Sequence, residues 1–209
     1  MAQTKTAEGA TDQTTAEVKP EDKPQRTQVG ADAPPGRTKR ITRRKAVEQK
    51  ARSYFEALDN RDADAMAAHW REDGVSDVVP VGVMRGRAEL REFFASMFAA
   101  MPDARTTVTR LIAGEQSCAV EWRIEGTFDG ASYMGIEPTG KHVEIRGLDL
   151  LELEDGEIVS LTAYFDGASY ARQIGMLPVD GSGADRAMKS AFNAVTKFRR
   201  AVADRRAAG

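Results

Sequence analysis

The stretch Asp155–Pro178, DGEIVSLTAYFDGASYARQIGMLP, combines a turn signal, an apolar run and a helical period within 24 residues. It opens with an Asp-Gly pair between two apolar runs, which is typical of the tight turn of a β-hairpin. The second run ends near Phe165, and Asp166 follows it. Apolar residues then recur at helical intervals until Pro178, which cannot extend a helix. The stretch therefore predicts a strand, an acidic residue and a short helix in succession.

Asp166 has two interpretations at this junction. Its carboxylate can cap the short helix by accepting hydrogen bonds from backbone N–H groups two or three residues later. It can also be a functional group at the mouth of a pocket. The sequence leaves both open.

Segments with a two-residue period precede the short helix, and segments with a helical period precede these in turn. We expect strands at 105–113, 117–128, 141–154 and 157–165, helices at 42–58, 63–70 and 86–101, and one or two short strands at 74–84. This order predicts an α+β fold with three N-terminal helices. The antiparallel sheet is expected to twist strongly and to curl into a cone.

Composition divides the chain into three parts. Residues 1–41 contain few large apolar residues, so we expect a disordered tail that cannot offset its ordering entropy. Residues 42–178 form the predicted domain, and residues 179–209 form a linker and an amphipathic C-terminal helix. The heptad-like spacing of that helix indicates docking on its own domain or on a second copy, with a membrane surface as a further alternative. We therefore expect a homodimer.

Charge follows the same division. Residues 51–182 contain 12 Lys and Arg against 23 Asp and Glu, whereas residues 1–50 contain 11 against 7 and residues 183–209 contain 7 against 2. Basic ends of this kind can contact nucleic acid or an acidic partner. The cluster at 37–45 lacks an interleaved aromatic residue, so a solvated linker is its simpler interpretation. No run approaches the ~20 apolar residues of a membrane span, which predicts no membrane partner and a cytoplasmic location.

Most common catalytic motifs are missing from the sequence. It has no phosphate-binding loop, no nucleophile elbow and no cysteine cluster, and its two histidines, His69 and His142, are far apart. The one cysteine, Cys118, lies in an apolar run and is interpreted as a core residue. We therefore expect no metal and no cofactor, and we expect any acid or base to be a carboxylate.

Asp149 is the second candidate carboxylate. On the strand VEIRGLDLLEL it shares its side with Val143, Ile145 and Leu151, so it is expected on an apolar face. Burial there would raise the pKa of the carboxyl toward neutrality, which suits proton transfer. The hairpin would place Asp149 opposite a residue between 157 and 162, so the sequence does not establish contact with Asp166.

Several other residues are candidates for binding. Large aromatic residues are candidate walls of an apolar pocket: Tyr54, Trp70, Phe94 and Trp122. Arg123 shares a strand face with Glu125, which is either an exposed charge ladder or a pair that orients a water or a carbonyl. His142 is the remaining candidate.

The chain from about residue 46 to 178 resembles the SnoaL-like polyketide cyclases, a family of the nuclear transport factor 2 superfamily. The resemblance rests on the element order, on the turns 126–130 (GTFDG) and 135–141 (GIEPTGK), and on the ending from Tyr164 to Gly175. It implies a cone-shaped domain that closes rings by acid–base chemistry without metal or cofactor. It also implies that the acid after the last strand, here Asp166, is the general acid or base.

Some positions depart from the family pattern. Thr162 stands where relatives commonly carry an aromatic residue, and His142 differs in strand parity from Asp149. Limonene epoxide hydrolases, of the same superfamily, resemble the chain at Arg123–Glu125. However, Ala163 stands where those enzymes have a second aspartate, which argues against epoxide hydrolysis.

Two functions follow as hypotheses. The first is an enzyme of lyase or isomerase type that acts on a small hydrophobic or aromatic molecule through Asp166, with electrostatic support from Asp149. The alternative is a noncatalytic dimerising scaffold or ligand-binding module whose basic tails dock a partner. Fold alone does not separate them, because one fold can host both.

Overall fold

The computed structural model describes residues 35–207 of the chain. Its elements are α1 Pro35–Asp59, α2 Ala63–Ala68, β1 Trp70–Val79, β2 Gly82–Arg85, α3 Gly86–Ala100, β3 Arg105–Ala113, β4 Ser117–Phe128, β5 Lys141–Glu154, β6 Glu157–Phe165, α4 Gly167–Ile174 and α5 Gly183–Ala207. The predicted disorder of the N-terminal tail concerns residues that lie mostly outside this description and stays a prediction.

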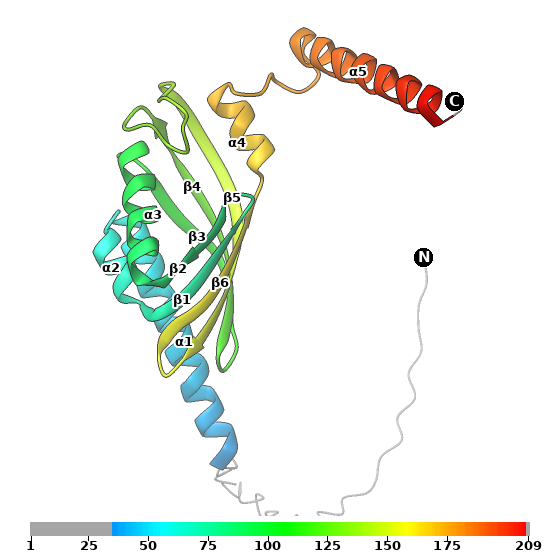
Figure 1. Cartoon of the computed structure of the whole chain (residues 1–209). Helices are drawn as coiled ribbons and strands as arrows, with labels where there is room; N and C mark the ends of the chain where they lie inside the picture. The colour runs from blue at the N-terminus through cyan, green and yellow to red at the C-terminus, as the bar shows by residue number, and fades with distance from the viewer. Residues whose placement is uncertain (1–34, 208–209) are drawn as a thin grey trace, which may run out of the picture. The chain divides into compact units, whose positions relative to one another are not determined.

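The six strands form one curved sheet in the order β2-β1-β6-β5-β4-β3. Helices α1, α2 and α3 lie against one of its faces (Figure 1). The predicted α+β class is confirmed, and the bounds of β3 to β6 agree with those predicted. The antiparallel prediction is wrong for one pair, because β1 runs parallel to β6. Tight turns determine the direction of consecutive strands, and no turn connects these two.

The hairpin between β5 and β6 has the predicted turn. Asp155 and Gly156 have φ angles of 47° and 84°. Two consecutive residues with positive φ match a two-residue hairpin turn, and Asp-Gly is a preferred sequence for it. This turn sets the register that places Asp149 opposite Ala163. The expected partner lay between residues 157 and 162, and the one-residue register shift at Glu152 and Leu153 accounts for the difference, since without it Asp149 would pair with Thr162.

Helix α1 begins at Pro35, earlier than the expected residue 42, so the end of the supposed disordered tail is helical. Proline is tolerated in the first turn of a helix, where its missing N–H has no intrahelical partner. Two arginines hold this part of α1 to the turn between β3 and β4. Arg40 Nε lies 2.6 Å from Glu115 Oε1, and Arg44 Nε donates to the Ala113 carbonyl oxygen at 3.1 Å.

Short helix α2 begins as predicted and ends earlier. Asp62 caps it by accepting a hydrogen bond from the Ala65 N–H at 2.9 Å. Trp70, expected to end this helix, instead begins β1 and is completely buried. Its indole packs edge-on against Tyr54 of α1, with ring centroids 6.2 Å apart. Burial of this large ring therefore joins α1 to the start of the sheet.

None of the described helices combines the length and apolar content that crossing a membrane requires.

Candidate functional site

A cavity of about 250 Å³ lies between the covered face of the sheet and helices α1, α2 and α3. Aromatic side chains and methionines make up about half of its lining residues: Tyr54, Phe93, Phe94, Trp122, Tyr133, Phe165, Tyr170, Met66, Met97, Met101, Met134 and Met176. Such a wall suits an apolar small molecule, and the flexible methionines allow its shape to adapt. Met134 and Met176 are also exposed, so the cavity reaches the surface beside them.

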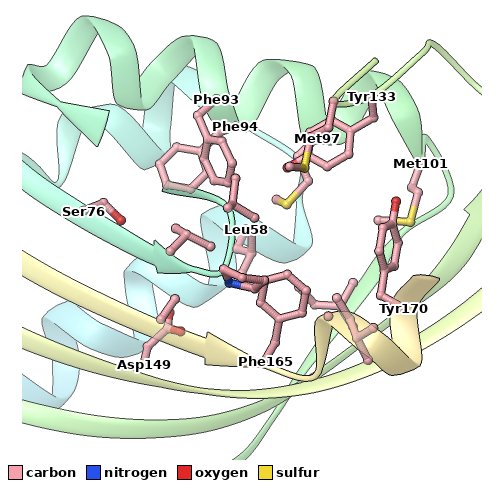
Figure 2. Close-up of a pocket in the computed structure, with 18 of the residues that line it drawn as sticks. Leu58, Ser76, Phe93, Phe94, Met97, Met101, Tyr133, Asp149, Phe165 and Tyr170 are labelled. Carbon is pink, nitrogen blue, oxygen red and sulfur yellow. The ribbon is translucent and has the colours of Figure 1, made fainter. Parts of the chain in front are cut away.

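The polar groups of the cavity lie at different ends. Asp149 and Ser76 lie at one end, while Tyr133 and Tyr170 lie at the other (Figure 2). Both Asp149 and Ser76 are buried. A ligand could thus contact a carboxyl group with one end and aromatic rings with the other.

The position of Asp149 follows from strand register. It lies on β5 between Val120 of β4 and Ala163 of β6, and Ala163 in turn pairs with Val78 of β1. Three of the four side chains in this row are apolar, so the carboxyl group lies on an otherwise apolar surface. It is 6% exposed. The prediction that Asp149 lies on an apolar face is confirmed.

A single described side chain holds the carboxyl group in place. Trp122 Nε1 donates a hydrogen bond to Asp149 Oδ1 at 2.7 Å. Among residues 35–207, no other side chain donates to this carboxyl group, and no Lys, Arg or His lines the cavity. The second carboxyl oxygen therefore remains available to a ligand.

Burial raises the pKa of Asp149 to about 7, and the hydrogen bond from Trp122 lowers it in part. The cause is desolvation, because a charged carboxylate loses its hydration without gaining a cation. Burial and the nearby Asp149 also raise the pKa of the Tyr54 hydroxyl well above its ordinary range. At neutral pH the site therefore holds both protonation states of one carboxyl group, which is what proton transfer requires.

Trp122 occupies space that Gly147 leaves empty. The two residues are directly paired across β4 and β5. A Cβ at position 147 would lie 2.2 Å from Trp122 Cζ2 and 2.5 Å from Cη2. Only glycine allows the indole to lie flat on the neighbouring strand and to reach Asp149.

Asp166, the expected general acid or base, lies outside the cavity lining, although its neighbours Phe165 and Gly167 line it. The side chain is exposed and accepts a hydrogen bond from the Ser169 N–H at 2.9 Å, which caps α4. Of the two interpretations open at the sequence level, the structure supports the cap. The catalytic role expected for Asp166 stays a prediction, and of the two candidate carboxyl groups it is Asp149 that lines the cavity.

Replacing Asp166 by alanine is expected to destabilise the protein by about 1 kcal/mol, because the first turn of α4 loses its cap. Asparagine accepts the same hydrogen bond, so Asp166→Asn should leave the unfolding midpoint almost unchanged. Urea denaturation of both variants measures this. A large gain in stability for Asp166→Asn would instead indicate a strained, functional carboxylate.

The other predicted binding residues divide between the cavity and the surface. Tyr54, Phe94 and Trp122 line the cavity, whereas Trp70 is buried outside its lining. Arg123 and His142 do not line it either.

Arg123 lies 3.4 Å from Glu125 and 3.6 Å from Glu144, within a partly exposed charge ladder. His142 is exposed. Both side chains alternate with inward-facing Trp122, Ile124 and Val143, so strand parity turns them to the opposite face of the sheet.

Three polar lining residues were missed. Ser76 lies two residues before inward-facing Val78 on β1 and so shares its face, and this parity was the available signal. Tyr133 lies in the loop between β4 and β5, where no periodicity operates. Tyr170 directly precedes buried Ala171 on α4, and its helical position could have identified it.

The remaining candidate groups do not add to the site. Cys118 is buried, and desolvation raises its pKa to about 11, which agrees with the predicted core role. Among the described residues, no group of three His, Cys, Asp or Glu side chains is placed to hold a metal ion.

The curved sheet, the helices on one face and the apolar cavity between them define a domain of the nuclear transport factor 2-like class. Residues 48–174 match the model of the family described as SnoaL-like polyketide cyclase. The chain belongs to this family, which confirms the resemblance noted from its motifs.

Solved structures support the same fold. AclR, a proposed hydroxylase from Streptomyces galilaeus, is 20% identical with a TM-score of 0.59, and the match covers 75% of this chain and 98% of AclR. A proposed SnoaL-like polyketide cyclase from Jannaschia sp. CCS1 is 19% identical with a TM-score of 0.56, covering 64% and 96%. A protein with a ketosteroid isomerase-like fold from Catenulispora acidiphila is 20% identical with a TM-score of 0.54, also covering 64% and 96%. A search of curated protein sequences found no match.

Proposed function

We propose that the protein is an enzyme that binds a small, uncharged, hydrophobic or aromatic molecule and moves a proton on it with Asp149. The observation that carries this proposal is the buried Asp149 carboxyl group, which lines an apolar cavity and has a pKa raised to about 7. A group with this pKa serves as base and acid with nearly equal ease at neutral pH.

The proposed reaction uses no cofactor and belongs to the cyclase or isomerase type. The Asp149 carboxylate removes a proton from a carbon next to a carbonyl, so the C–H bond breaks and an O–H bond forms on Asp149. The electron pair moves into an enolate, which attacks an electrophilic carbon of the same molecule or takes the proton back at another carbon. Asp149 returns its proton in the second half of the reaction, and the enzyme ends unchanged.

The residues that line the cavity determine which substrate charge it can accept. Since no described cation lines the cavity, an anionic group near Asp149 would meet a like charge without compensation. The aromatic rings favour flat apolar surfaces. We therefore expect neutral aromatic ketones to enter and carboxylate-bearing analogues to be excluded.

Hydrogen–deuterium exchange into 2-tetralone, a neutral aromatic ketone, tests the proposal. We expect the wild type to accelerate exchange at the carbons beside the carbonyl in D2O, followed by NMR, and Asp149→Asn to remove the acceleration. Asp166→Asn is the matched control, since it changes an exposed carboxylate three residues after Ala163, the residue that pairs with Asp149. This variant should behave as wild type. Binding of the neutral fluorophore N-phenyl-1-naphthylamine checks that each variant keeps the cavity.

Equal exchange rates in wild type and Asp149→Asn, with the fluorophore bound by both, would contradict the proposal. That outcome would favour the alternative of a ligand-binding module without catalysis. Loss of exchange in Asp166→Asn alone would return the catalytic role to the residue that the family resemblance indicates.

A further inference from the structure

Helix α5 presents large apolar side chains to solvent. Met188, Phe192, Val195 and Phe198 are all exposed, and Phe192 and Phe198 are each 70% exposed. Their spacings of four, three and three residues place them on one side of the helix. Aromatic side chains clustered in this way usually mark an interaction surface.

A second apolar surface lies on the face of the sheet opposite the helices. Leu148 of β5 pairs with Tyr164 of β6, which pairs with Val79 of β1, and all three are exposed. Leu150 adds to this row, and Ala119 connects it to exposed Ile112 at β3. Of the helices between residues 35 and 100, none covers this face (Figure 1). We call Val79, Leu148, Leu150 and Tyr164 the outer patch.

Charge makes the two surfaces complementary. Residues 183–209 carry 7 Lys and Arg against 2 Asp and Glu, whereas residues 51–182 carry 12 against 23. Glu121 pairs in register with Leu148, and Asp77 pairs with Thr162, the neighbour of Leu150. On α5, Lys197, Arg199 and Arg200 flank Phe198. Basic side chains therefore flank the apolar side of α5, and acidic side chains lie beside the outer patch, where Arg110 lies 3.8 Å from Glu121.

Pairing of two α5 helices with each other accounts for fewer of these features than a contact between α5 and the outer patch. It would bring helices of like net charge together and would leave the outer patch exposed. A contact between α5 and the outer patch instead buries both apolar surfaces and brings opposite charges together.

We infer that α5 of one copy packs across the outer patch of a second copy, and that the exchange is reciprocal. Two identical contacts related by a two-fold axis then form a closed dimer. The cavity is lined by the opposite face of the sheet, so this inference does not depend on the proposed function. Because part of the attraction is electrostatic, the dimer is expected to weaken as salt rises.

Light scattering of the full chain after size exclusion tests this inference with three double variants. The helix variant is Phe192→Ser with Phe198→Ser, and the patch variant is Leu148→Thr with Leu150→Thr. The control variant, Ile41→Ser with Val179→Ser, changes two exposed apolar residues that lie on neither surface. Circular dichroism checks that each variant is folded.

We expect wild type and control to be dimers, and the helix and patch variants each to raise the dimer Kd at least tenfold. Mixing the two variants tests whether α5 of one copy binds the outer patch of another. The intact α5 of the patch variant can still bind the intact patch of the helix variant, so the mixture should form a heterodimer with one contact.

Other outcomes would overturn the inference. A monomeric wild type at 100 μM would exclude the dimer. If the helix variant stays dimeric, the sheets pair without α5. If the patch variant stays dimeric, the α5 helices pair with each other or with another surface. If both variants are monomers and their mixture stays monomeric, α5 of one copy does not bind the outer patch of another.

Discussion

Replacing Asp149 by asparagine is expected to stabilise the folded protein at pH 8 by on the order of 2–4 kcal/mol. Burial raises the pKa of this carboxyl from 3.8 to about 7. Between these pH values the folded state keeps a proton that the unfolded state has lost. Wild-type stability therefore falls as pH rises through this window, and asparagine, which stays neutral and can accept the Trp122 hydrogen bond, avoids the loss.

Thermal unfolding of both proteins from pH 4 to pH 8 measures this effect. The difference should be small at pH 4, should grow toward pH 7 and should then level off at roughly 4–16 °C. Asp166→Asn provides the control, since its carboxylate is exposed and it should follow wild type throughout. A difference that is independent of pH, or that favours wild type at pH 8, would show that Asp149 is charged in the folded protein at low cost.

Gly147→Ala is expected to be the most disruptive single methyl addition in the site. The new Cβ would lie 2.2 Å from the Trp122 ring, so the indole must move away from β5. We expect a loss of roughly 2–4 kcal/mol, at or above the usual range for overpacking, because both residues lie within paired strands. Moving Trp122 also breaks its hydrogen bond to Asp149, and the pKa of Asp149 should rise further.

Urea denaturation measures the loss of stability, and tryptophan fluorescence reports the movement of Trp122. Gly183→Ala is the matched control, because a Cβ at Gly183, the first residue of α5, has no neighbour within 4 Å. It should be neutral or slightly stabilising. If Gly147→Ala were equally mild, Gly147 would not be what positions Trp122.

Much of the fold could be predicted because its signals are local. Alternating apolar residues identified β3 to β6, and Asp155–Gly156 identified the hairpin. The same parity placed Asp149 on the covered face. The parallel pairing of β1 with β6 could not be predicted in this way, since it joins segments that are distant in sequence.

The site was harder to predict because it depends on which face each side chain occupies. Strand parity predicted the buried position of Asp149, whereas Asp166 follows the end of a strand, where parity gives no information and the structure was needed to show an exposed cap. Trp122 was expected as a wall, but its role as the donor to Asp149 depends on Gly147 of another strand. Arg123 and His142 were predicted from residue type, and strand parity turns both away from the cavity.

A ¹³C NMR titration of the Asp149 carboxyl carbon, assigned by comparison with Asp149→Asn, tests whether this group can transfer a proton at neutral pH. We predict a midpoint near pH 7, since desolvation without a cation raises the pKa. A midpoint below pH 5 would mean that the carboxyl group is ionised and well solvated at neutral pH. Asp149 would then lack the property on which the proposed proton transfer depends.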